Sequence, residues 1–150
     1  MKRVLSMVLC TACLLLCACA FAEKTAGDGF LLKVWDESGL EISYLKFEIY
    51  AGGQLRSLVM SCPNEGEDFY RCEYAPLDPE EQKDLRIVCS YGVSDLPPDE
   101  AILAAYSGKS VEEYPLLTME DGGFEAGQVY ELRLVPGEDG SWRLEPAENG

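Results

Sequence analysis

Apolar and polar side chains alternate over several short stretches of this chain, which is typical of β-strands with one buried face. Turn-forming residues separate the stretches, and many short strands at such spacing favour a sandwich or barrel. We predict an all-β fold, a mostly antiparallel β-sandwich of the Ig-like or prealbumin-like kind with one short helix. The expected strands are 30–35, 42–50, 55–62, 69–74, 85–91, 129–135 and 141–144, with an edge strand at 114–117.

The alternation changes phase inside the second stretch. Ile42 and Tyr44 share one phase, whereas Leu45, Phe47 and Ile49 share the other. Because successive side chains of a strand point to opposite faces, this change predicts a β-bulge, or two strands that meet at a bend.

One segment carries helix signals instead. Pro98 and Asp99 open it and Gly108 closes it, which predicts a short helix near 98–107. We expect this helix to pack over an edge or open end of the sandwich. Its large apolar residues are expected to face the domain's own core; they are Ile102, Leu103 and Tyr106.

The N-terminus has the order of a secretion signal. Lys2 and Arg3 precede an apolar run, and Ala20 and Ala22 give the small-residue pattern that signal peptidase reads. We predict a signal peptide over 1–22, cleaved between Ala22 and Glu23. The remainder, 23–150, is expected to form a single β-sandwich domain with a helical insertion, secreted or extracytoplasmic and without a transmembrane span.

Two alternatives apply to the same segment. The sequence Leu-Cys-Ala-Cys that ends at Cys19 is similar to a bacterial lipobox, in which Cys19 becomes the lipidated first residue. The product would be a membrane-tethered lipoprotein. An uncleaved signal, which nearly reaches the ~20 apolar residues of a membrane span, would instead be an anchor.

The net charge and the absence of histidine exclude several classes of partner and of catalytic site. The 150 residues include 12 Lys and Arg against 27 Asp and Glu, a formal net charge of −15. A surface of this sign repels nucleic-acid phosphates and anionic membranes, so we expect no nucleic-acid partner. The sequence has no histidine, which excludes Ser-His-Asp and Cys-His machinery in its usual form and histidine-ligated metals. We predict no catalytic residue, no cofactor and no metal site.

Three cysteines follow the predicted signal. Outside the cytoplasm thiols oxidise readily, and an odd number permits at most one bridge within a monomer. We favour a disulfide between Cys62 and Cys72, which end and enter strands joined by one loop, with Cys89 as a buried thiol. A bridge between Cys72 and Cys89, or three buried thiols with no bridge, are the alternatives.

The order of elements from 32 to 92 resembles the collagen-adhesin B-repeat (Cna-B) domain, and more loosely transthyretin-like and carboxypeptidase-regulatory sandwiches. The resembling segments are 33–39, 45–50 with its Gly52-Gly53 turn, 69–76 and 85–91. The resemblance implies a stalk or accessory module on a bacterial surface, and Lys33 resembles the lysine that such domains join to an asparagine. Because the expected last strands contain no asparagine, we predict no such crosslink.

These observations favour an exported bacterial, non-enzymatic β-sandwich that acts as a surface or secreted binding or structural module. Its expected partner is an unknown protein or glycan at the cell surface. A secreted inhibitor or ligand carrier that uses the insertion at 92–127 is the alternative, and a carboxylate-based hydrolase follows it. Trp35 and Trp142 are expected to serve core packing and hairpin pairing rather than a sugar-stacking platform.

Overall fold

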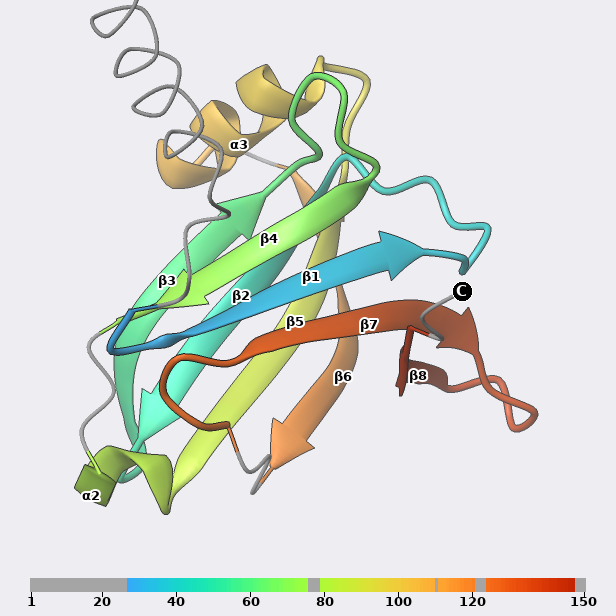
Figure 1. Ribbon diagram of the computed structural model, residues 1–150. Helices are drawn as coiled ribbons and strands as arrows, with labels where there is room; N and C mark the ends of the chain where they lie inside the picture. Colours follow the sequence, from blue (N-terminus) through green and yellow to red (C-terminus); the bar gives the residue numbers. More distant parts are fainter. Residues whose placement is uncertain (1–26, 76–78, 110, 121–123, 148–150) are drawn as a thin grey trace, which may run out of the picture.

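The computed structural model describes residues 27–75, 79–109, 111–120 and 124–147 (Figure 1). Within these residues it confirms the predicted fold class, because two packed β-sheets make up most of the molecule and one short helix lies outside them. The elements are β1 (Phe30–Asp36), β2 (Tyr44–Ala51), β3 (Gln54–Ser61), β4 (Phe69–Tyr74), α2 (Pro79–Gln82), β5 (Leu85–Val93), α3 (Pro98–Tyr106), β6 (Glu112–Glu120), β7 (Val129–Pro136) and β8 (Trp142–Pro146).

The strands form two four-stranded sheets. Sheet A has the order β4-β1-β7-β8 and sheet B the order β3-β2-β5-β6. Neighbouring strands pair antiparallel, except that β1 and β7 run parallel at the centre of sheet A. A parallel pair needs a long connection, and here most of the chain lies between its two strands.

The main core lies between the two sheets and follows the period of two that the sequence shows. Phe30, Leu32 and Val34 of β1 face inward from sheet A, and Phe47 and Ile49 of β2 face them from sheet B. The other buried members of this core cluster are Leu45, Ala51, Tyr70, Cys72, Leu85, Ile87, Cys89, Phe124 and Leu134.

The predicted phase change in the second strand has a different cause from the one expected. β2 begins at Tyr44, so Ile42 precedes it, and the register shift between β2 and β3 falls at Ile49 and Tyr50. Tyr44 is fully buried although it lies outside the main core cluster. Apolar residues of both phases occur here because both faces of β2 are covered at this end.

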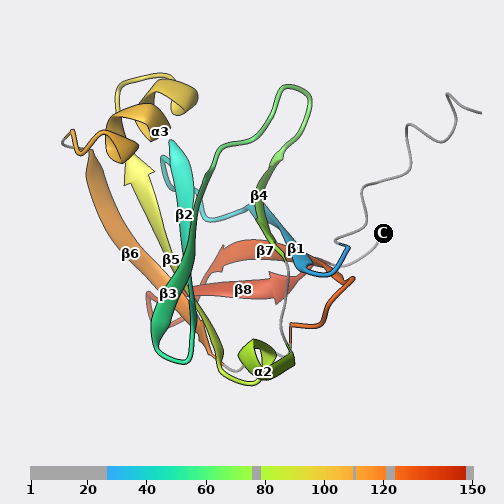
Figure 2. The same cartoon turned by 90° about the vertical axis from the view of Figure 1, so that its left-hand side faces the viewer.

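The helix forms where the sequence predicts it, but it buries a different face from the expected one. α3 lies over the ends of β2 and β5 (Figure 2), and its two buried residues are Ala101 and Ala104. Leu103 and Tyr106 are 65% and 56% exposed, so the expectation that they face the core is wrong. Small side chains on the inner face let the helix approach the sheet closely, which leaves the large ones outside.

The structure holds the three described cysteines as free thiols. It therefore contains neither the favoured bridge between Cys62 and Cys72 nor its rival with Cys89. β3 and β4 belong to different sheets, so the two residues are not neighbours in one ladder. Cys72 is buried in the core, whereas Cys62 follows β3 and is half-buried.

The predicted cleavage site at Ala22 and Glu23 and the alternative lipidation site at Cys19 lie outside the described residues. Among the helices that the structure does describe, none combines the length and apolar character needed to cross a membrane.

Candidate functional site

Exposed apolar side chains concentrate around α3. Among the described residues six large apolar side chains are exposed, and Leu55 and Val129 are the two that lie elsewhere in the sequence. The other four fall between residues 96 and 114, namely Leu96, Leu103, Tyr106 and Tyr114. Leu103 and Tyr106 lie about one turn apart on α3, and because exposed apolar patches are often functional, α3 is the first candidate site.

Local sequence determines where this helix begins and ends. Pro97 adopts φ −51° and ψ 147° at the N-cap, and Pro98 is the first helical residue, a position where its missing N–H costs nothing. Asp99 stands in the first turn, where negative charge favours the helix dipole. At the other end Gly108 has φ +68° and donates its N–H to the Ala105 carbonyl oxygen at 3.1 Å. A glycine in the left-handed backbone conformation is a common C-terminal cap of right-handed helices.

One face of α3 projects into solvent. Asp99, Leu103 and Tyr106 are spaced i, i+4 and i+7, so their side chains share one side of the helix. Ala101 and Ala104 are on the opposite side and are buried. We call the three exposed side chains the α3 face.

A fully buried tyrosine begins the strand that α3 contacts. α3 contacts β2, where Tyr44 is fully buried. The Tyr44 ring lies against Gly92 of β5, since a Cβ built on Gly92 would come within 2.2 Å of the ring. Any side chain at position 92 would therefore displace the Tyr44 ring.

The Tyr44 hydroxyl belongs to a charged network. It donates to Glu113 Oε1 at 2.8 Å, and Lys46 Nζ donates to Glu113 Oε2. Burial alone would raise the pKa of Glu113, but the hydrogen bonds from Lys46 and Tyr44 outweigh it and hold that pKa below its ordinary value. Burial, followed by the bond to Glu113, raises the pKa of Tyr44 far above its ordinary range.

This network connects three strands. Tyr44 is paired with Gly92, and Gly92 with Glu113, so β2, β5 and β6 meet here in register. β6 is an edge strand of sheet B. The bonds to Glu113 therefore connect the edge strand β6 to the interior strand β2, which α3 contacts.

The surroundings of the α3 face are acidic. From 92 to 114 the sequence contains five carboxylates and, as its single basic residue, Lys109. The carboxylates are Asp95, Asp99, Glu100, Glu112 and Glu113. A partner with basic groups around an apolar surface would complement this charge.

Other residues singled out in the sequence serve the framework. Trp35 Nε1 donates to Asp68 Oδ1 at 3.1 Å, and Trp142 packs against the main core, so the two tryptophans do not share one platform. Lys33 is 8% exposed, and its Nζ lies 3.6 Å from Glu131 Oε1 on the neighbouring strand. Among the described residues no group of three or more Cys, Asp or Glu is placed to hold a metal ion.

Comparisons with known proteins leave the family open. No family model matches the chain, and no curated protein matches it. A crystal structure of (S)-allantoin synthase is similar at 12% identity and a TM-score of 0.41, over 83% of this chain. The chain spans 46% of the length of that protein. The likeness is too distant to carry an argument about function.

Sequence reasoning missed the network of Tyr44, Lys46 and Glu113. Tyr44 and Glu113 are far apart in the chain, and neither belongs to a motif. The available signal was the second apolar phase of β2, which marked Tyr44 as buried on the outer face of its sheet. Gly92, which pairs with Tyr44 on the neighbouring strand, leaves room for the tyrosine ring and was the second sign of its burial.

Proposed function

We propose that this protein is an exported, non-enzymatic β-sandwich that binds another protein through the α3 face. The observation that supports the proposal is the exposure of Leu103 and Tyr106 on a helix whose other side is fixed to the sheet. A preformed helix that presents large apolar side chains avoids the conformational entropy that folding on binding would cost.

The chemistry of the surface indicates the kind of partner. An apolar helix face docks into an apolar groove, and its anchors recur at i, i+3, i+4 and i+7. Leu103 and Tyr106 have this spacing, with Asp99 one turn before them. We therefore expect a protein groove lined by apolar residues and rimmed by Lys or Arg.

The non-enzymatic part of the proposal rests on the titratable groups. The absence of histidine removes the usual general base. Glu113 has a lowered pKa, but its carboxylate is paired with Lys46 and bonded to Tyr44. Shifted pKa values also occur in structural ion pairs, and this arrangement stabilises an edge strand without presenting a base to a substrate.

The test is affinity capture from extracellular and membrane fractions with three forms of the protein. They are the wild type, the double variant Leu103→Ser/Tyr106→Ser, and the control Leu55→Ser, which removes a 50% exposed leucine from β3. The purified captured protein should bind the wild type and the control equally. Its affinity for the double variant should fall by at least about 30-fold, as for an interface hot spot.

Circular dichroism melts should show the same stability for all three forms, since the changed side chains are exposed. Retention of the partner by the double variant, or equal loss with Leu55→Ser, would refute the α3 face as the contact surface. If the partner is an enzyme, its activity in the complex separates an inhibitor from a structural module.

A further inference from the structure

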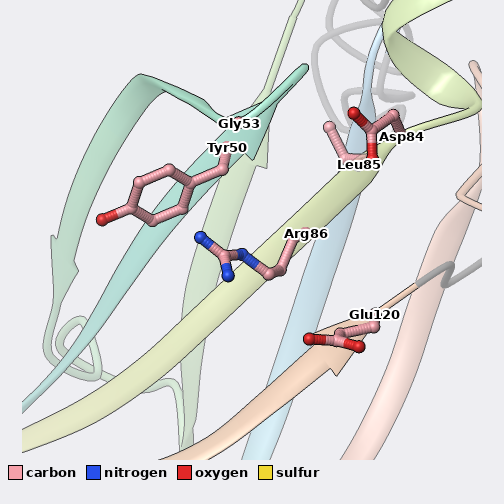
Figure 3. A pocket seen from close by; sticks show the side chains of 6 residues that line it. All are labelled: Tyr50, Gly53, Asp84, Leu85, Arg86 and Glu120. Atoms are coloured by element: carbon pink, nitrogen blue, oxygen red, sulfur yellow. The ribbon is translucent and has the colours of Figure 1, made fainter.

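Apart from the α3 face, the structure has a pocket on the outer face of sheet B, at the end away from α3. Its volume is about 370 Å³, within the range of small-molecule sites. Side chains from β2, β5 and β6 line it, and those of Tyr50, Arg86 and Glu120 extend to the same side of the sheet (Figure 3). The lining residues are Tyr50, Gly53, Asp84, Leu85, Arg86 and Glu120.

Three of these side chains form a row across the sheet. Tyr50 pairs with Arg86, and Arg86 pairs with Glu120, so they lie on adjacent strands and share one face. The Arg86 guanidinium lies over the Tyr50 ring, 4.7 Å from the ring centroid, and this cation–π contact holds it in place. Gly53 has φ +72° in the β2–β3 turn and carries no side chain, which leaves one rim open.

The polar groups that line the pocket select the chemistry of a ligand. The carboxylates of Asp84 and Glu120 only accept hydrogen bonds, whereas the Arg86 guanidinium only donates them. A ligand that satisfies all three must both donate and accept, which hydroxyl groups do. The two carboxylates and the net charge of −15 repel an anionic ligand, and the guanidinium repels a cationic one.

We propose that this pocket is a binding subsite for a neutral saccharide. Hydroxyl groups of the saccharide donate to Glu120 and Asp84 while a ring or hydroxyl oxygen accepts from Arg86. The subsite does not depend on the α3 face, because it occupies the other end of sheet B and uses different residues.

The experiment titrates neutral and acidic trisaccharides into the ¹⁵N-labelled protein. Cellotriose, maltotriose and chitotriose are the neutral probes, and trigalacturonate is the acidic one. At least one neutral probe should shift the amide signals of Gly53 and Arg86, with a Kd in the millimolar range or tighter. Trigalacturonate should bind at least about tenfold more weakly than that probe.

Two variants and one control test the residues. Arg86→Ala and Glu120→Gln should each weaken binding by about tenfold or more, because each removes a charge-assisted hydrogen bond. Arg143→Ala changes an exposed arginine on β8 of the other sheet and should bind as the wild type does. Glu120→Gln keeps the shape of the side chain and so remains informative if Arg86→Ala loses stability.

Three results would overturn the proposal. They are the failure of every neutral probe to move these amide signals, unchanged affinity in both variants, and binding of trigalacturonate as tight as that of the neutral probes. Loss of saccharide binding with intact protein capture by α3 would leave the proposed function standing, and the reverse result would leave the subsite standing.

Discussion

The two core thiols show how strongly burial acts on single residues. Burial raises the pKa of Cys89 to about 12. Burial, with a smaller effect from Cys89, raises the pKa of Cys72 further. Since the thiolate is the reactive form, both residues behave as small apolar side chains at neutral pH.

Alkylation distinguishes these thiols from Cys62. In the native protein iodoacetamide should modify half-buried Cys62 first. Cys72 and Cys89 should react at least about 100-fold more slowly, because the protein must unfold locally or globally before the reagent can reach them. Peptide mass spectrometry at timed quenches gives the three rates. In denaturant without reductant all three should react fully, and two cysteines that stay unmodified there would reveal a disulfide that the structure does not contain.

At the scale of elements, the support of α3 is an ionic network whose strength depends on pH. Glu113 accepts from Tyr44 and Lys46, and its pKa lies below its ordinary value in the folded protein. The unfolded chain binds a proton at higher pH than the folded one. The network therefore contributes stability above the ordinary pKa, and this contribution is lost as the pH falls towards the lowered value.

The variant Glu113→Gln should be less stable than the wild type by about 1 kcal/mol at pH 7. The difference should shrink as the pH falls below about 4.5, the ordinary pKa of this carboxyl. Urea unfolding from pH 3 to pH 7 measures it. Glu80→Gln removes an 83% exposed partner of Lys83 and should change stability little at any pH. Equal curves for Glu113→Gln and the wild type would show that the network is energetically neutral.

The elements themselves were largely predictable, because alternation marks a half-buried strand from local sequence alone. The expected strands at 69–74 and 129–135 agree with β4 and β7 to within one residue. β6 extends well beyond the expected 114–117, since it is an edge strand whose polar ends are held by pairing with β5. Pairing with a distant segment leaves no trace in the strand's own alternation.

The candidate surfaces were less predictable than the strands. The helix at 98–107 was expected, but its orientation depends on tertiary contacts: Ala101 and Ala104 are its buried residues, and α3 contacts β2, a strand far away in the sequence. The row of Tyr50, Arg86 and Glu120 exists because three strands align in register. Register and packing are tertiary properties, so local patterns could not place either surface.

At the scale of the whole molecule, sheet B separates the two proposed surfaces. α3 covers the start of β2 and the end of β5, whereas the pocket lies at the opposite ends of these strands. Both surfaces stand on strands that are paired along most of their length. Because the α3 face and the pocket lie at opposite ends of sheet B, a ligand bound at one surface leaves the other accessible. One molecule can therefore connect a protein partner to a saccharide.

Removal of the predicted signal peptide would decide where the mature chain begins. β1 is an inner strand of sheet A, paired with β4 on one side and β7 on the other. Gly29, just before it, packs so closely that an added Cβ would come within 1.8 Å of the Tyr74 carbonyl oxygen. Cleavage after Ala22 leaves this framework complete. Because Ala20 and Ala22 give the pattern that signal peptidase reads, mass spectrometry of secreted protein should find Glu23 as the first residue.

Two truncated forms add a structural check to that measurement. A chain that starts at Glu23 should unfold cooperatively, because it keeps every described element. A chain that starts at Glu37 lacks β1 and its core residues, which include Phe30 and Leu32, and should not fold, since their loss costs several kcal/mol of a marginal total. A secreted form that begins with lipidated Cys19 would make the protein a membrane-tethered lipoprotein, and an uncleaved form would make the segment an anchor.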